Sequence, residues 1–237
     1  NYDGLIDGLN AAWGAQAEYG AVFDEFAWKK MQGVYGPAPE VGAAQLILPD
    51  YIDPVAAVMI ITLREVLAAI NTFGIKPNQP TVVYGCGPVG ITFTKLMSIL
   101  GVYPIIALDV KDDKLDYAKE MGADYTFNSK DLSYIGKVRE LCPGGVQNAL
   151  IAVGVTDLIN QAMELIADAG KICNYGVPAN NSMNLDWEKV PYNWQLIFQQ
   201  MPAFQDLTDA TQQIFSLIRT GILDLKEFIS DYFETKD

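Results

Sequence analysis

The feature that most constrains this chain is a set of three glycines, Gly85, Gly87 and Gly90, between two apolar patterns. Residues 81–84 form an apolar run before the glycines, and residues 89–100 follow them with the periodicity of an apolar helix. A glycine turn between a buried strand and a helix exposes the backbone at the helix N-terminus without side chains. The free N–H groups of such a terminus attract phosphate.

A second apolar segment, residues 105–108, ends in Asp109, nineteen residues after Gly90. The order of strand, glycine turn, helix, strand and acid is the one that binds a dinucleotide. Gly85 allows the tight turn, Gly87 lets the backbone approach the pyrophosphate, and Gly90 lets helix and strand pack closely. We therefore predict a dinucleotide site, in which the acid holds ribose hydroxyls. The alternatives are a helix N-cap role for Asp109 and a methyltransferase with a similar glycine turn.

Asp109 also indicates which dinucleotide the site prefers. Its charge accepts a hydrogen bond from a 2′-hydroxyl but repels a 2′-phosphate. The next residue, Val110, supplies no compensating arginine. We therefore expect NAD rather than NADP.

Strand and helix patterns alternate on both sides of the glycine turn. Strands that are apolar throughout, separated by helices, belong in a parallel sheet covered on both faces. The predicted fold class is therefore α/β, a doubly wound parallel sheet of the Rossmann type. The expected strands are 81–84, 105–109, 125–127, 148–153 and 171–175, and the expected helices are 53–73, 89–100, 111–121, 132–141 and 157–167.

The flanking segments have a different character. Residues 1–50 carry glycines, prolines and aromatics in short alternating stretches, which indicates part of a β-rich module. Residues 202–237 contain one amphipathic helix, at about 206–220. We therefore expect three parts: a partial β-rich module (1–50), a dinucleotide-binding domain (51–201) and a segment that returns toward the first module (202–237).

The composition argues against several classes of partner and site. Sixteen basic and 29 acidic residues give a net charge of −13, so nucleic acids and anionic membranes are repelled. No apolar stretch is expected to span a bilayer. The scattered cysteines, Cys86, Cys142 and Cys173, form no disulfide framework, which favours a reducing cytoplasm, and Cys86 is expected to pack rather than to react. The chain has no histidine, so a histidine base or metal ligand is not available.

Several further motifs resemble the medium-chain dehydrogenase/reductase family of alcohol, sorbitol and threonine dehydrogenases. Gly14-Ala15-Gln16-Ala17-Glu18-Tyr19 is similar to the family's Gly-Gly-Phe-Ala-Glu-Tyr, and Leu48-Pro49-Asp50 resembles its entry into the cofactor domain. The family's spacing is then kept by the glycine turn, Asp109, Lys114, Met121-Gly122-Ala123-Asp124, Ala152-Val153-Gly154 and Tyr175-Gly176-Val177-Pro178. The resemblance covers nearly all of the chain.

The resemblance implies a two-domain enzyme, with a GroES-like catalytic module and a Rossmann domain. Such an enzyme transfers a hydride between a nicotinamide and an alcohol or carbonyl. The resemblance also implies a role for each matching residue. The pyrophosphate is lined by Gly85, Gly87, Pro88, Val89 and Gly90, the adenosine ribose is held by Asp109 and Lys114, and the nicotinamide end is bordered by Val153, Gly154, Tyr175, Gly176 and Val177.

The zinc ligands of that family are not matched. Its cysteine and histidine ligands belong to an N-terminal part outside this sequence, and its third ligand aligns with Ile61, which cannot bind zinc. The four-cysteine zinc lobe is missing as well, and the family's last helix and strand would begin near Asp237. We therefore expect either part of a longer protein or a shortened, zinc-independent relative, and no catalytic residue is identified.

The leading hypothesis is a cytoplasmic NAD-dependent oxidoreductase that acts on a small alcohol, polyol or sugar. The alternative is a catalytically silent or zinc-independent dinucleotide-binding relative. Residues 187–200 lie where the family joins its subunits, so they are expected to form the edge strand of a homodimer or homotetramer, with Gln199 or Gln200 near the nicotinamide end. Arg64 and Glu65 are expected either as a pair at the cleft between the modules or, as the favoured alternative, on the solvent face of their helix.

Overall fold

The computed structural model of this chain describes residues 5–6, 9–10, 47–180 and 182–231. The chain divides into two compact units, Asn1–Ile47 and Leu48–Asp237. In the first unit, the short strands β1 (Leu5–Ile6) and β2 (Leu9–Asn10) pair antiparallel. The remaining residues up to 46, which include the motif at 14–19, lie outside the described residues.

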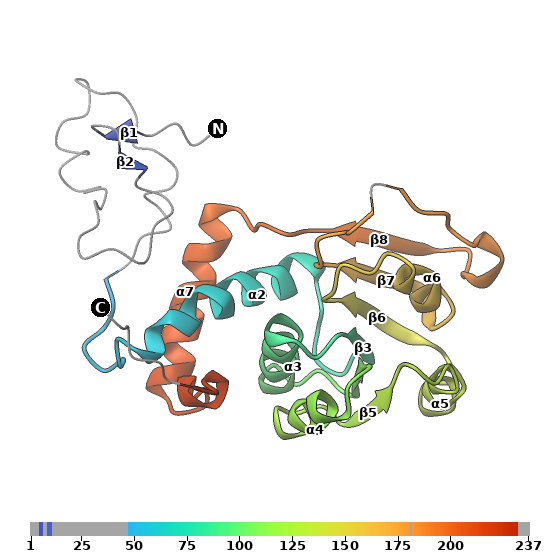
Figure 1. Cartoon of the computed structure of the whole chain (residues 1–237), viewed down its shortest axis with the longest axis horizontal. Coiled ribbons are helices and arrows are strands. Elements are labelled where there is room, and N and C mark those ends of the chain that lie inside the picture. The colour runs from blue at the N-terminus through green and yellow to red at the C-terminus, as the bar shows by residue number, and fades with distance from the viewer. Residues whose placement is uncertain (1–4, 7–8, 11–46, 181, 232–237) are drawn as a thin grey trace. The chain divides into compact units, whose positions relative to one another are not determined.

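The second unit is built on a six-stranded sheet (Figure 1). The strand order is β5-β4-β3-β6-β7-β8, and every neighbouring pair is parallel. This is the order of a doubly wound dinucleotide-binding sheet, so the predicted fold class is confirmed. The strands are β3 (Thr81–Tyr84), β4 (Ile105–Asp109), β5 (Tyr125–Asn128), β6 (Val146–Ile151), β7 (Ile166–Asn174) and β8 (Trp194–Phe198).

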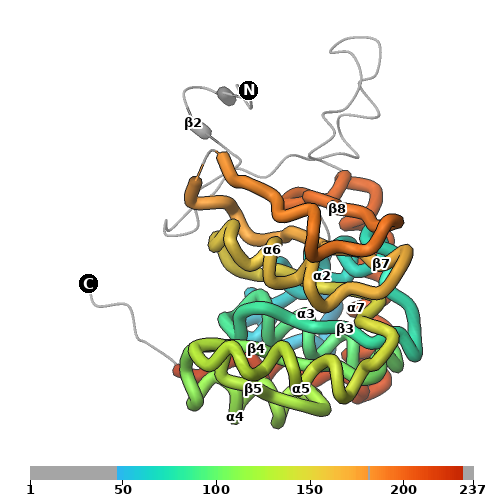
Figure 2. Tube along the Cα trace, turned by 90° about the vertical axis from the view of Figure 1, so that its right-hand side faces the viewer, coloured from blue at the N-terminus to red at the C-terminus, as the bar shows by residue number. Residues whose placement is uncertain are grey.

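Helices cover both faces of the sheet (Figures 1 and 2). Helices α2, α3, α4 and α7 contact one another in one layer, whereas α5 and α6 share a core cluster with the opposite face of the strands. Burial on both faces explains why the central strand β3 is apolar throughout. The helices are α2 (Met59–Phe73), α3 (Pro88–Ile99), α4 (Asp112–Glu120), α5 (Tyr134–Leu141), α6 (Leu158–Met163) and α7 (Phe204–Arg219), with the short 3-10 helices η2 (Ala56–Val58), η3 (Trp187–Lys189) and η4 (Leu225–Phe228).

The strand order places a switch point at β3. Its two neighbours are β4 and β6, so the chain connections leave β3 in opposite directions. Ligands bind in the crevice that opens at the carboxyl ends of strands at such a point. Backbone hydrogen bonds tie these ends together. The N–H of Gly85 donates to the Leu108 carbonyl at 2.7 Å, and the N–H of Ala152 donates to the Tyr84 carbonyl at 3.0 Å.

The long helix predicted from residue 53 begins later. The Asp53 carboxylate accepts a hydrogen bond from the Val55 N–H at 2.9 Å, and η2 precedes the start of α2 at Met59. The predicted exit at Gly74 is confirmed. This glycine has a φ of 63°, and its N–H caps the helix on Ile70 and Asn71. A side-chain turn at Asp53 therefore delays the regular helix.

The helix predicted over 157–167 is wrong at its C-terminal end. Helix α6 ends at Met163, and β7 begins at Ile166, which pairs with Val146 before the register shifts. Gly170 follows the shift, and a Cβ there would lie 2.7 Å from the Ala167 carbonyl oxygen. The apolar residues at the end of the helix pattern fit a helix or a strand. Their long-range pairing with β6 makes them a strand, and a local sequence pattern does not show such a pairing.

Among the described residues, one helical segment, Ala56–Phe73, is long and apolar enough by composition to cross a membrane, contrary to the expectation from the sequence. Half of it is buried inside the unit, and α2 packs against α3 and α7. Core helices of packed proteins commonly have this composition. The segment is therefore weak evidence for a membrane span.

Candidate dinucleotide site

The three glycines of the turn meet three different environments. Gly85 has a φ of 95°, and a Cβ there would lie 2.4 Å from Cγ1 of Val153. A Cβ at Gly90 would lie 1.8 Å from the Gly85 carbonyl oxygen, so helix α3 packs directly on the turn. A Cβ at Gly87 would meet nothing within 4 Å. The space beside Gly87 is therefore open to a ligand.

Helix α3 begins beside this open space. Gly87 is its N-cap in an extended conformation, Pro88 occupies the first turn, and no side chain caps the helix. An uncapped N-terminus leaves the N–H groups of the first turn, such as those of Val89 and Gly90, for a ligand. Together with the helix dipole they suit a phosphate group.

Asp109 joins the two strands that border the crevice. One carboxylate oxygen accepts a hydrogen bond from the Cys86 N–H at 2.7 Å, and the other accepts from the Lys111 N–H at 3.0 Å. The N-cap of α4 is Lys111, so Asp109 is not the helix cap that the alternative interpretation expected. The carboxylate instead fixes the glycine turn, and its remaining lone pairs can accept from ribose hydroxyls.

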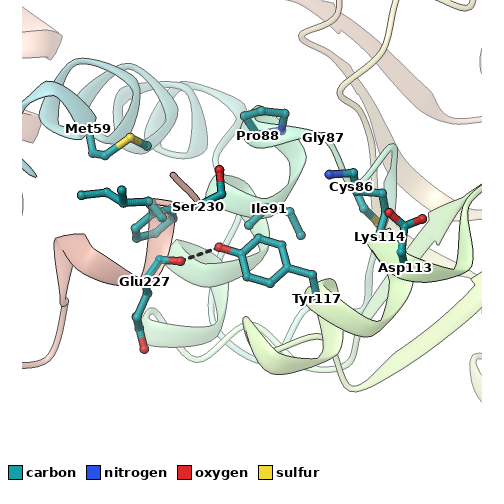
Figure 3. A pocket seen from close by; sticks show the side chains of 12 residues that line it. Met59, Cys86, Gly87, Pro88, Ile91, Asp113, Lys114, Tyr117, Glu227 and Ser230 are labelled. Carbon is teal, nitrogen blue, oxygen red and sulfur yellow. Dashed lines mark hydrogen bonds between the residues drawn. The ribbon is translucent and has the colours of Figure 1, made fainter. Parts of the chain in front are cut away.

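A pocket of about 340 Å³ lies against the glycine turn (Figure 3). The turn and the first part of α4 form much of its wall, and Lys114 is the only basic residue among those that line it in the described part of the chain. A pocket of this size suits part of a dinucleotide. The lining residues are Met59, Cys86, Gly87, Pro88, Ile91, Asp113, Lys114, Tyr117, Glu227, Phe228, Ile229 and Ser230.

Cys86 is buried within the turn. Burial, and then the nearby Asp109 carboxylate, raise the pKa of its thiol to about 12. A thiol with this pKa stays protonated near neutral pH and is a poor nucleophile. The expectation that Cys86 packs rather than reacts agrees with this environment.

The residues expected at the nicotinamide end lie in the loops after β6 and β7. A Cβ at Gly154 would lie 2.3 Å from the Val177 carbonyl oxygen, and a Cβ at Gly176 would lie 2.2 Å from that of Val153. The two loops therefore pack backbone to backbone. The Tyr175 ring meets the Phe93 ring edge-on, with 5.2 Å between centroids. These residues form a second group, which does not line the pocket beside Gly87.

Arg64 and Glu65 differ from their favoured placement on the solvent face of their helix. Both side chains are half-buried rather than on the open face of α2, and burial lowers the pKa of Arg64 and raises that of Glu65.

Residues 194–198 form the expected edge strand β8. At its end the Gln199 N–H donates to the Asn174 carbonyl at 3.1 Å, which places Gln199 beside the carboxyl end of β7.

The sequence did not indicate several residues of the pocket. Tyr117 lies one turn after Lys114 on α4, so its helical spacing was an available signal. Glu227 and Ser230 come from a segment far along the chain, and nothing in the local sequence links that segment to the glycine turn. Met59 reaches the pocket from α2.

The described residues do not offer a zinc site. Among them, no group of three or more histidine, cysteine, aspartate or glutamate side chains is placed to hold a metal. Ile61, which aligns with the third zinc ligand of the family, lies on α2 with 53% of its surface exposed. An aliphatic side chain has no donor atom for a metal.

Comparison with known proteins agrees with this architecture. The zinc-binding dehydrogenase family matches residues 88–201. L-threonine 3-dehydrogenase from Pyrococcus abyssi (strain GE5 / Orsay) is 23% identical over 230 residues, which are 94% of this chain and 59% of that protein. The chain therefore spans little more than half the length of this relative.

Two solved structures share the fold. An alcohol dehydrogenase from Escherichia coli CFT073, complexed with NADH, is 19% identical with a TM-score of 0.67, over 77% of this chain and 52% of that one. A structure from Sinorhizobium meliloti 1021, bound to NADP, is 23% identical with a TM-score of 0.63, over 75% of this chain and 52% of that one. The matched family, the dehydrogenase relative and the shared fold agree with the motifs around the glycine turn. Over residues 88–201 the chain is therefore similar to the zinc-binding dehydrogenases, in agreement with its resemblance to the medium-chain dehydrogenase/reductase family.

Proposed function

We propose that the protein is an NAD-dependent oxidoreductase that transfers a hydride between a nicotinamide and a small alcohol, polyol or sugar. The proposal rests on a difference between the three glycines of the turn. Neighbouring atoms fill the space at Gly85 and Gly90, whereas the space at Gly87 is open beside an uncapped helix terminus. This arrangement admits a pyrophosphate. The NADH and NADP bound by proteins of the same fold support a nicotinamide cofactor.

A bound nicotinamide would supply the hydride chemistry, and the protein would supply binding and orientation. The N–H groups in the first turn of α3 would hold the pyrophosphate. Asp109 and Lys114 would hold the adenosine ribose. Gly154 and Gly176 allow the loops after β6 and β7 to pack closely, and these loops would border the nicotinamide end.

The preference for NAD over NADP rests on the carboxylate of Asp109. Both of its oxygens already accept backbone hydrogen bonds, so the negative charge is fixed at the end of β4. A 2′-phosphate at this place would lie next to that negative charge. Lys114 is the one basic residue that lines the pocket in the described part of the chain. Like charges held close together in a partly buried site repel strongly.

The test is a pair of measurements on the full chain. Titration with NADH and NADPH, followed by the enhancement of cofactor fluorescence, should show saturable binding of NADH and weaker binding of NADPH. Oxidation of NADH should then be followed with a panel of small aldehydes, ketones and sugars. If neither cofactor binds, the proposed function is wrong.

The second candidate is a dinucleotide-binding relative without catalytic activity. It is favoured by the exposed isoleucine at position 61, where the family has a zinc ligand. Elemental zinc analysis of the purified protein, combined with the same carbonyl panel, separates the two functions. Saturable NADH binding with no turnover of any carbonyl or alcohol would favour the silent relative.

We also propose a homodimer or homotetramer in the cytoplasm, joined through the edge strand β8. One side of this strand has no partner in the described chain, and large apolar side chains are exposed on and near it. An unpaired edge with exposed apolar side chains is suited to pairing with a second copy. Light scattering after size exclusion would test this state. The exposed side chains are Trp187, Tyr192, Leu196, Phe198 and Met201.

A further inference from the structure

The segment after α7 returns to the glycine turn. Residues 227–230, which we call the strap, close one side of the pocket that the turn and α4 line (Figure 3). Tyr117 and Glu227, which touch there, are 110 positions apart in the sequence. The buried side chains of Leu223 and Leu225 fix the chain just before the strap.

Glu227 connects the strap to both helices that carry the site. Its carboxylate lies 2.7 Å from Nζ of Lys95 on α3. Its backbone carbonyl accepts a short hydrogen bond from the Tyr117 hydroxyl on α4 (Figure 3). Burial, and then the charges of Glu227 and Glu120, raise the pKa of Tyr117, so this hydroxyl stays protonated and remains a donor. The strap is therefore anchored on two sides of the pocket.

The strap presents groups that suit a sugar phosphate. Ser230 offers an exposed hydroxyl in the pocket lining, opposite a turn whose backbone N–H groups attract phosphate. Phe228 and Ile229 are half-buried and add apolar surface, as Pro88 and Ile91 do on the side of the turn. Lys114 supplies the positive charge. Polar groups on both sides and apolar surface between them match a ribose joined to phosphate.

We propose that the strap is the second wall of the binding site for the ribose and phosphate groups in the adenine half of the dinucleotide. Lys95 and Tyr117 are positioning residues, which hold the strap in place through Glu227. This inference rests on the proposed function, because it assigns a further part of the same site. It adds to the glycine turn a segment that the sequence motif does not contain.

The test measures binding of ADP-ribose, which has the adenine half, and of nicotinamide mononucleotide, which does not. Isothermal titration would compare the full chain with Lys95→Met, Tyr117→Phe and the double variant. Lys95 does not line the pocket, so its replacement removes no contact to the ligand. The matched control is Lys189→Met, which breaks another ion pair, with Glu164 at 2.9 Å, in a different part of the unit.

Each single variant should bind ADP-ribose about threefold more weakly, the effect of a partly exposed ion pair or one neutral hydrogen bond. The double variant should lose about tenfold. The control should equal the wild type, and no variant should change the binding of nicotinamide mononucleotide. A folded double variant, judged by circular dichroism, that binds ADP-ribose as tightly as the wild type would overturn the role of the strap.

Hydrogen exchange on the wild type gives a second readout that needs no variant. ADP-ribose should slow exchange in residues 225–231 as well as in the glycine turn at 85–91. Slower exchange at the turn alone would show that the ligand binds without the strap, which overturns this inference and leaves the proposed function intact. If the wild type binds no ADP-ribose, both proposals are wrong.

Discussion

The glycines of the turn allow a sharp test, because alanine should have different effects at two of them. Gly87→Ala should weaken NADH binding, whereas Gly90→Ala should lower the stability of the fold. A methyl group at Gly90 would lie 1.8 Å from the Gly85 carbonyl oxygen, and only movement of α3 against the turn relieves this contact. Overpacking costs about 1 to 3 kcal/mol, and occasionally more. Because the contact at Gly90 is with rigid backbone, Gly90→Ala should lower the free energy of unfolding by about 3 kcal/mol, at the upper end of this range.

Gly87→Ala should leave the fold almost unchanged. Its φ of −72° suits alanine, and no atom lies within 4 Å of the new methyl group. Loss of glycine at the helix N-cap costs about 0.5 to 1 kcal/mol, and the smaller entropy of the unfolded chain offsets about 0.4 to 1 kcal/mol. The net change is near zero. The methyl group occupies the space proposed for the pyrophosphate, so NADH binding should weaken at least about tenfold, which is about 1.4 kcal/mol.

Urea denaturation and NADH titration of both variants form the assay. We expect a stable Gly87→Ala protein with weak NADH binding and an unstable Gly90→Ala protein. A Gly87→Ala protein that is stable and binds NADH like the wild type would refute the location of the pyrophosphate. A Gly90→Ala protein as stable as the wild type would contradict the packing of α3 on the turn.

Three further predictions concern other parts of the same unit. Asp109→Asn leaves one acceptor oxygen for the two N–H groups of Cys86 and Lys111. It should therefore destabilise the protein by about 1 to 3 kcal/mol in urea denaturation and weaken NADH binding. An unchanged stability would contradict the bridging role of this carboxylate. Lys171→Met removes the ammonium that donates to the Phe73 and Gly74 carbonyls at 2.9 and 3.1 Å. The midpoint of thermal unfolding should therefore fall. The control variant, Lys130→Met on the surface, should leave this midpoint unchanged. Burial raises the pKa of both Cys86 and Cys173 to about 12, so these thiols ionise in the unfolded chain before they ionise in the native protein. Stability should therefore fall as pH rises from about 9 toward 12, and the native thiols should resist a disulfide reagent at pH 8 until denaturant is added; rapid labelling of native protein would contradict their burial.

Local sequence signals predicted the strands around the glycine turn well. Strands β3 and β4 have the predicted limits, because the glycine turn and Asp109 mark their ends in the sequence. The need for glycine at positions 85 and 90 was also predictable, since the motif specifies a tight turn and close packing of helix and strand there. These features depend on contacts between neighbouring segments of the chain.

Long-range contacts explain what the sequence did not predict. The early start of β7 depends on its pairing with β6. The half-burial of Arg64 and Glu65 depends on what packs against α2, which a local pattern does not contain. The strap reaches the glycine turn because α7 packs on α2 and η4 also contacts α2, which lets Glu227 meet Lys95 on α3 and Tyr117 on α4. No periodicity within residues 225–230 indicates such a contact.

The most direct test of the dinucleotide site is a crystal structure of the full chain soaked with NADH. The predicted result is pyrophosphate density beside Gly87, within hydrogen-bond distance of the N–H groups in the first turn of α3, with a ribose on Asp109. NADH bound elsewhere in the molecule, with the space beside Gly87 filled only by solvent, would contradict the account.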